Sequence, residues 1–266
     1  MVALLILALA GPPVTDAERE EFLRYGEVQE VARAGQGVTA SRRATLQLNG
    51  ITHDAHVQIV DIQHRPLASF ANFEPGFTDS FKYNIAAYEL DRLLGLELSP
   101  VCVFRPFERK SAAFCWWVDD VQMTEAQRRA KRLHPPDVAH HSRQLWRMRV
   151  FDQLIYNTDR NQGNILFDGQ WRLWAIDHTR AFRVWPKLKD PDLVTQIDRA
   201  LLERLRALTR EQVTQRTEAW LSRQQIDGLM ARRDLILQRI EELVARHGEQ
   251  AVIFDWSGFG GREEGP

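Results

Sequence analysis

Residues 156–166 read YNTDRNQGNIL, and residues 174–178 read WAIDH. Three oxygen-bearing side chains are spaced along this region: Asp159, Asn164 five residues later, and Asp177 thirteen residues after that. Asn164 and Asp177 each adjoin a short apolar run of the kind that forms a buried strand. The pattern therefore predicts that a carboxylate, an amide and a second carboxylate converge from separate segments.

These three side chains match the needs of phosphoryl transfer from ATP. That reaction uses one carboxylate to orient the acceptor hydroxyl, and an amide oxygen and a second carboxylate to bind Mg²⁺. The same offsets separate the catalytic-loop aspartate, its asparagine and the metal-binding aspartate of protein kinases. An EF-hand calcium loop fits poorly, because Gly163, Asn164 and Gln170 stand where Asp or Asn, Gly and Glu are required. Phosphoryl transfer is the first interpretation.

The bulk composition is that of a globular protein with one large domain or two lobes. The chain has 266 residues, of which 44% are apolar and 27% are charged. Its 35 basic and 36 acidic residues give a formal net charge of −1, so nothing favours a nucleic-acid partner. Cys102 and Cys115 are too few for a disulfide scaffold. We expect two buried free thiols, with a disulfide between neighbouring strands as the alternative.

The first half of the chain, residues 14–122, reads as a small β-rich lobe. Alternating runs at 44–48 and 55–60 flank Asn49-Gly50, which is a strong signal for a hairpin. Gly95 predicts the end of a helix over 84–94. The further expected elements are a surface helix over 15–32, a strand at 67–70 and a strand pair at 100–104 and 112–118.

The second half, residues 123–254, is predicted to be a mainly helical lobe. Apolar residues at helical spacing predict a helix over 142–156, directly before the YNTDRNQGNIL loop. A charged helix over 124–133, strands at 165–167 and 173–176, and closing helices over 193–208, 210–221 and 226–246 complete this lobe. Residues 255–266 are expected to form a flexible tail.

Three segments resemble the kinase-like superfamily, in its phosphatidylinositol 3-/4-kinase, HipA-type and Golgi secretory kinase branches. Residues 84–96, followed by Pro100, resemble the regulatory helix of those families. Residues 159–166 resemble the lipid-kinase catalytic loop, and residues 176–182 resemble the Ile-Asp-Phe-Gly metal motif, with His-Thr in place of Phe-Gly. The resemblance covers roughly residues 35–182. It implies an α+β, bilobal protein-kinase-like fold with ATP and Mg²⁺ as cofactors.

The resemblance also implies a role for individual residues. Asp159 corresponds to the catalytic aspartate, and Asn164 and Asp177 correspond to the Mg²⁺ ligands. Glu89 corresponds to the helix carboxylate that pairs with a strand lysine. The remaining expected nucleotide-binding positions are Gly35 and Gly37 in a phosphate-covering turn, and Trp117 and Val118 in the hinge that meets adenine.

The expected strand lysine is missing. The run at 55–60 has Gln58 at that position, and the candidate replacement cations are Lys82, just before the helix, and, as the second choice, Arg65. An amide donates hydrogen bonds but brings no charge to a polyphosphate. Two alternatives to an active kinase therefore remain open. One is a pseudokinase that binds nucleotide as a regulatory or scaffold module, and the other is a kinase fold that transfers AMP.

Residues 1–13 are expected to be a signal peptide or an N-terminal extension. The apolar run ends in Ala8-Leu9-Ala10, as at a cleavage site, but it lacks a basic n-region and is too short to span a membrane. Export is the first expectation and a cytoplasmic location the alternative. The expected partners are a nucleotide and a hydroxyl-bearing acceptor of unidentified class, whether a protein, a lipid headgroup or a small molecule.

Overall fold

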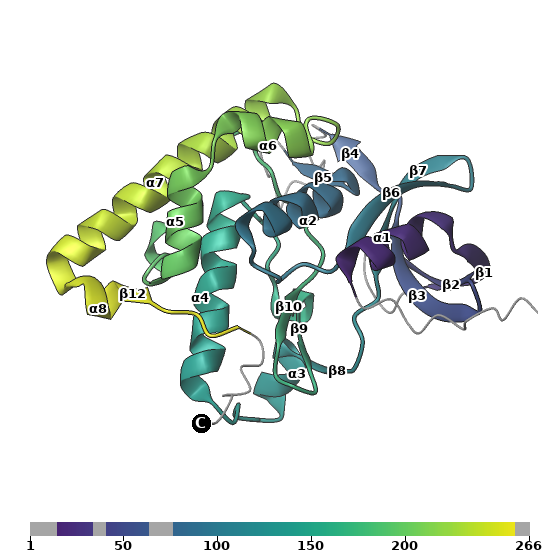
Figure 1. Cartoon of the computed structure of the whole chain (residues 1–266), viewed down its shortest axis with the longest axis horizontal. Coiled ribbons are helices and arrows are strands. Elements are labelled where there is room, and N and C mark those ends of the chain that lie inside the picture. Colours follow the sequence, from purple (N-terminus) through teal and green to yellow (C-terminus); the bar gives the residue numbers. More distant parts are fainter. Residues whose placement is uncertain (1–14, 34–40, 64–76, 259–266) are drawn as a thin grey trace, which may run out of the picture. The chain divides into compact units, whose positions relative to one another are not determined.

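The computed structural model describes residues 15–33, 41–63 and 77–258 (Figure 1). The chain divides into two compact units. Residues 1–60 and 101–117 form the first, and residues 61–100 and 118–266 form the second. The helix over 84–94 thus groups with the second unit, while the expected lobe boundaries, 14–122 and 123–254, stay predictions. The positions Gly35 and Gly37, residues 1–13 and the expected strand at 67–70 lie outside the described residues.

A five-stranded antiparallel sheet forms the first unit. Its strand order is β1 (Glu27–Arg33), β2 (Arg42–Leu48), β3 (Ile51–Gln58), β7 (Lys110–Trp116) and β6 (Cys102–Phe107). Asn49 and Gly50 connect β2 to β3 with φ of 51° and 80°, the left-handed pair that a two-residue hairpin turn needs. The hairpin prediction is therefore confirmed.

The helix expected over 15–32 is shorter than predicted. α1 (Asp16–Tyr25) begins with a capping box at Thr15 and ends at Gly26. A Cβ at position 26 would lie 2.7 Å from the carbonyl oxygen of Phe22, so only glycine fits this close approach. After it the chain enters β1, which pairs with β2. β1 was missed because most of its side chains are exposed and polar, so it carries no alternating apolar pattern.

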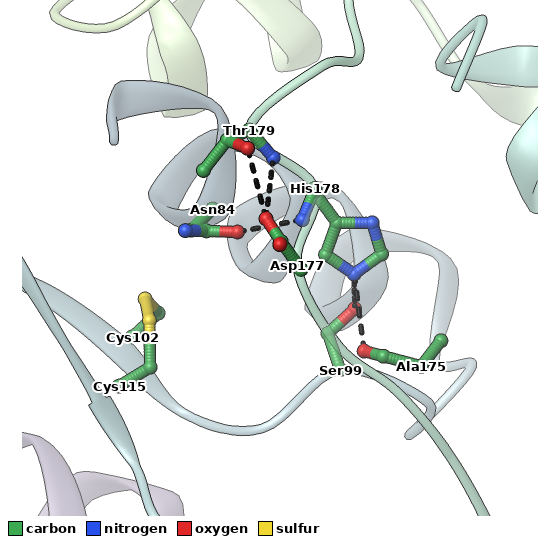
Figure 2. Close-up of a disulfide and its surroundings, with 8 residues drawn as sticks. All are labelled: Asn84, Ser99, Cys102, Cys115, Ala175, Asp177, His178 and Thr179. Atoms are coloured by element: carbon green, nitrogen blue, oxygen red, sulfur yellow. Dashed lines mark hydrogen bonds between the residues drawn. A yellow bond between two sulfur atoms is a disulfide. The ribbon is translucent and has the colours of Figure 1, made fainter. Parts of the chain in front are cut away.

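Cys102 and Cys115 form a disulfide in the structure (Figure 2). They are directly opposed in the register of β6 and β7. Residues opposite each other on antiparallel strands have their Cβ atoms close together, which permits a cross-strand bond. The expectation of two free thiols was therefore wrong, and the alternative holds.

The second unit begins with a small β-element and a helix. β4 (Asp61–Gln63) pairs with β5 (Thr78–Ser80), which leads into α2 (Lys82–Leu94). Gly95 ends α2 in the left-handed conformation, with φ of 55°, as predicted for a C-terminal cap. The short β4–β5 pair has no counterpart among the predicted elements.

The rest of the second unit is mainly helical and includes a small three-stranded sheet (Figure 1). β8 (Val121–Thr124), β9 (Ile165–Asp168) and β10 (Leu173–Ala175) form that sheet in the order β10-β9-β8. The longer helices are α4 (Val138–Leu154), α5 (Arg199–Ala207), α6 (Arg210–Thr217) and α7 (Arg223–His247). Shorter elements are α3 (Glu125–Ala130), α8 (Glu249–Val252), the 3₁₀ turns η1 (Gln162–Asn164) and η2 (Pro191–Leu193), and the parallel pair β11 (Ile197–Asp198) and β12 (Ile253–Phe254).

One apolar core holds the second unit together. Leu90 of α2, Phe151 of α4 and Leu229 of α7 belong to the same buried cluster, together with Phe182 from the segment after β10. Burying these side chains is the main stabilising contribution to the unit. This core fixes the helices and strands that flank the segments of the site. Within the described ranges, none of the helices combines the length and the apolar character needed to cross a bilayer.

Candidate active site

Asp159, Asn164 and Asp177 all lie in the second unit, and short contacts join their segments. The Asn164 side chain donates from Nδ2 to the backbone carbonyl of Asp159 at 3.1 Å. The backbone carbonyl of Asn164 accepts from the N–H of Ile176 at 3.1 Å, which places the residue before Asp177 beside Asn164. The three segments therefore converge, while the chemical roles of the three side chains stay predictions.

Buried polar contacts shape the loop before Asp159. α4 ends at Leu154, and Tyr156 turns the chain through a left-handed conformation with φ of 50°. Asn157 is only 3% exposed and donates from Nδ2 to Asp152 Oδ1 at 3.1 Å. Its own Oδ1 accepts the backbone N–H of Asp159 at 2.9 Å. The backbone at Asp159 is thus tied to the last turn of α4.

Asp177 occupies a left-handed backbone conformation, with φ of 55°. Such a conformation costs energy for a residue with a side chain, and it is found often at functional sites. Asp177 Oδ1 accepts from the Thr179 hydroxyl at 2.8 Å and, more weakly, from the Thr179 backbone N–H at 3.4 Å (Figure 2). One carboxylate oxygen therefore secures the turn, and Oδ2 carries no hydrogen bond from the part of the chain that is described.

The donor set fits a hard divalent cation. Because Asn164 uses its Nδ2 for Asp159, its Oδ1 is left for an ion, as is Asp177 Oδ2. Mg²⁺ prefers oxygen ligands, and it is usually bound by one or two protein groups together with phosphate oxygens and water. No group of three His, Cys, Asp or Glu side chains among the described residues is arranged to hold an ion by itself. A metal site here would rely on one amide, one carboxylate and the phosphates of the nucleotide.

Asp79, at the middle of β5, is a third carboxylate of this region that the sequence did not indicate. It is 5% exposed, and its Oδ1 has no hydrogen-bond partner among the described residues. Burial raises the pKa of the Asp79 carboxyl, and the negative charges of Asp177 and Asp159 raise it further. A hydrogen bond to Thr179 opposes this rise. Asp79 thus adds to this region a buried carboxyl whose pKa is raised, above all by burial.

α2 places Asn84, a residue without a predicted role, against the segment that follows Asp177. Asn84 accepts the backbone N–H of His178 with its Oδ1 at 2.7 Å (Figure 2). Glu89, the expected lysine partner, forms an ion pair with Arg216 of α6 at 3.5 Å instead. Asn84 belongs to the segment that suggested a regulatory helix, but nothing in the sequence distinguished it from its neighbours.

Two cations near the site are committed to carboxylates. Lys82 Nζ lies 2.9 Å from Asp61 Oδ2. Arg180 Nη1 lies 3.5 Å from Asp159 Oδ2, and its guanidinium stacks over the ring of Phe77. Among the described residues, the cation that reaches the predicted catalytic carboxylate is thus Arg180, which follows Asp177 by three residues.

The other predicted nucleotide-binding residues are described within their own units. Gln58 is fully buried at the end of β3, and neither its amide oxygen nor its nitrogen has a partner in the described ranges. Trp117 of the first unit donates its backbone N–H to Asp54 at 3.1 Å. Val118 is buried in the second unit. Their roles stay predictions.

His178 and Arg160 are polar residues of the second unit to which the resemblance assigned no role; for His178 the sequence left open a contact with the site or packing in the core. His178 is 2% exposed, and burial and the nearby Arg160 guanidinium hold the pKa of its imidazole well below the usual 6.5. The imidazole is therefore neutral at physiological pH. The signal available in the sequence was position alone, since Arg160 follows Asp159 and His178 follows Asp177.

The chain matches no protein-family model and no curated protein sequence at a significant level. Solved structures do share its fold. A structure of hydra Fam20 with sugar is 13% identical, with a TM-score of 0.72 over 92% of this chain and 94% of that one. A Golgi casein kinase with Mn and ADP bound is 14% identical, with a TM-score of 0.64 over 90% of this chain and 78% of that one.

A third solved structure with a similar fold is a bacterial kinase. The proinflammatory kinase CtkA of Helicobacter pylori is 13% identical, with a TM-score of 0.53 over 86% of this chain and 97% of that one. Identities this low show the fold and not the activity. The chain therefore has a kinase-like fold, with a β-rich sheet unit and a helical C-terminal part.

Proposed function

We propose that the protein is a phosphotransferase that uses ATP and a divalent cation to phosphorylate a hydroxyl group. The observation that carries this proposal is the convergence of Asp159, Asn164 and Asp177, with one oxygen each of Asn164 and Asp177 left for a metal. Asp159 would orient the acceptor hydroxyl and accept its proton. Bound metal would neutralise charge on the nucleotide phosphates as the bond to the leaving group breaks.

The missing strand lysine is the main departure from this chemistry. Gln58 is neutral, and losing one charge-assisted contact in a desolvated site costs a few kcal/mol, or roughly two to three decades in rate. Arg180 is placed to compensate in part, because its guanidinium already reaches Asp159, where the acceptor and the γ-phosphate must meet. The proposal therefore includes slow turnover compared with a kinase that has the strand lysine.

Among the branches that the motifs resemble, we favour the Golgi secretory type. Two of the similar structures are a Fam20 protein and a Golgi casein kinase, and one of them holds Mn and ADP. The Cys102–Cys115 disulfide agrees with this choice, because disulfides persist in oxidising compartments. We therefore favour export, and manganese should be tested beside magnesium. The acceptor class stays open among protein, lipid headgroup and small molecule.

Substitution of the metal ligand tests the proposal. Asp177→Ala should lower metal-dependent release of ADP from ATP by about 10³-fold or more, because it removes the one charged protein ligand of the proposed metal site. Asp192→Asn is the matched control, because its side chain is 93% exposed. Equal turnover of wild type and Asp177→Ala would refute the assignment.

Binding and product measurements separate the alternatives. A regulatory pseudokinase would be stabilised against heat by Mn²⁺ with ADP, yet would release no phosphate or ADP from ATP. A nucleotidyltransferase would add AMP to its target, which mass spectrometry of the products distinguishes from addition of a phosphoryl group.

A further inference from the structure

The guanidinium of Arg160 is almost completely buried, and every one of its donors has an acceptor. Its side chain is 9% exposed. Nε and one Nη2 hydrogen bind the Asp152 carboxylate at 3.0 and 3.1 Å. Nη1 binds the backbone carbonyls of Asn164 and Ile176 at 2.8 and 2.6 Å. A guanidinium has five N–H donors, so one Nη2 hydrogen is left after these four bonds.

The fifth acceptor is His178. Its Nδ1 lies 3.1 Å from Arg160 Nη2. Because arginine donates and never accepts, this contact is a hydrogen bond only if Nδ1 carries no hydrogen. A neutral imidazole must then carry its hydrogen on Nε2. The acceptors for that hydrogen are present, namely the carbonyl of Ala175 at 3.1 Å and the hydroxyl of Ser99 at 3.3 Å (Figure 2).

We propose that His178 is a positioning residue, fixed as the Nε2–H tautomer, which holds Arg160 where its guanidinium secures the backbone at Asn164 and Ile176. These two carbonyls belong to the peptides that carry the predicted metal ligands, since Asp177 follows Ile176 directly. The consequence for metal binding rests on the proposed function. The tautomer and the pairing with Arg160 do not.

The other side of the imidazole connects this assembly to α2. Ser99, whose hydroxyl faces Nε2, also donates its backbone N–H to the Asp91 carboxylate of α2 at 2.8 Å. The backbone N–H of His178 is held by Asn84. His178 therefore links α2 to the loop of Asp159, and it does so through both ring nitrogens and the backbone. A phenylalanine at this position could fill the space but would leave one buried Arg160 hydrogen without an acceptor, which is costly.

Two isosteric substitutions separate the two sides of the ring. Asparagine places its Oδ1 near the position of Nδ1 and keeps an acceptor for Arg160. Glutamine places its Nε2 near the position of the ring Nε2 and keeps only the Ser99 and Ala175 side. Both variants lose one side of the ring, so both should lower Tm by a similar amount, about 2–4 °C for each lost hydrogen bond.

The affinity for nucleotide should differ among the same variants. We expect His178→Asn to bind Mn²⁺–ADP within a few-fold of wild type in calorimetric titrations. His178→Gln and His178→Phe should bind it about 10- to 100-fold more weakly, the usual cost of losing a residue that orients metal ligands. A histidine that merely fills the core predicts another order, in which the large apolar phenylalanine retains the most affinity. That order would overturn the proposal.

Two readouts are independent of nucleotide binding and decide the pairing even if the proposed function fails. In protein labelled with ¹⁵N-histidine, the resonance assigned by its loss in His178→Asn should show hydrogen on Nε2 and none on Nδ1. Protonated Nδ1 overturns the proposal. In an Arg160→Lys background, whose ammonium has three donors and needs no fifth acceptor, His178→Phe should lower Tm by less than it does in wild type. Equal losses in the two backgrounds would also overturn it.

Discussion

The Asp91 carboxyl makes the stability of this protein depend on pH in a direction opposite to that of an ordinary paired aspartate. Asp91 is 2% exposed on α2, and its Oδ2 accepts the backbone N–H groups of Leu98 and Ser99 at 2.9 and 2.8 Å. These bonds favour the ionised form, but burial outweighs them. Burial raises the pKa of the Asp91 carboxyl from 3.8 to about 6.

The sign and size of the effect follow from that shift. The folded protein holds the Asp91 proton more tightly than the unfolded chain, so raising the pH from about 4 to about 6 deprotonates the unfolded chain first. The free energy of unfolding therefore falls with rising pH in this window. A shift of about 2 pKa units at 1.36 kcal/mol each gives a total loss of about 3 kcal/mol.

Asp91→Asn removes this titration while keeping an oxygen for the two N–H groups. The difference in unfolding free energy, wild type minus variant, should fall by about 3 kcal/mol between pH 4 and pH 7, measured by urea titrations at constant m. Asp137→Asn is the contrasting control. The backbone N–H of His140 lowers the pKa of the Asp137 carboxyl, so its contribution is lost only as the pH falls. A wild-type minus Asp91→Asn difference that stays flat with pH would refute this account of Asp91.

Two further changes test interactions inside each of the two units. Replacing both Cys102 and Cys115 by serine should lower the free energy of unfolding by about 2–4 kcal/mol. The disulfide joins residues that are 13 positions apart in the sequence and so restricts the unfolded chain. Reductant should lower the free energy of unfolding of wild type but not of the double variant. An unchanged free energy of unfolding of wild type in reductant would contradict the disulfide. Gly228→Ala in α7 should cost about 1–3 kcal/mol in urea unfolding, although alanine favours helix by about 1 kcal/mol, because the new Cβ would lie 2.7 Å from the Val184 carbonyl oxygen. Gln238→Ala, at an exposed position of α7, should change little, and a stabilised Gly228→Ala would show that this contact relaxes freely.

Local signals in the sequence predicted those parts of the fold that depend on few residues. Asn49-Gly50 specified its hairpin because both positions need left-handed backbone, and Gly95 marked the end of α2 for the same reason. β1 escaped prediction because an exposed edge strand has no apolar alternation to detect. β4 and β5 escaped because each has three residues, too few to show a period.

Some residues of the candidate site could likewise be predicted from the sequence, and others could not. Asp159, Asn164 and Asp177 were predicted from spacing within one short segment of chain. Asp79 and Asn84 come from a different segment, and Asn84 meets His178 across 94 residues of sequence. Spacing carries no information about such contacts, since they depend on how β5 and α2 pack against the loop. Glu89 illustrates the limit, because the sequence predicted its helix but not its ion pair with Arg216 of α6.

Donor counting at Arg160 supplies a link that spacing could not. An arginine directly after Asp159 must find five acceptors if it is buried, and one carboxylate with two carbonyls satisfies only four donors. The fifth acceptor in this structure comes from the side chain that follows Asp177. A phenylalanine there, as in the resembled motif, cannot accept, whereas the imidazole Nδ1 of His178 does. His178, which departs from the motif, and Arg160 of the predicted catalytic loop thus depend on each other. The effect of a substitution at either position should follow from the number of buried N–H donors that it leaves without an acceptor.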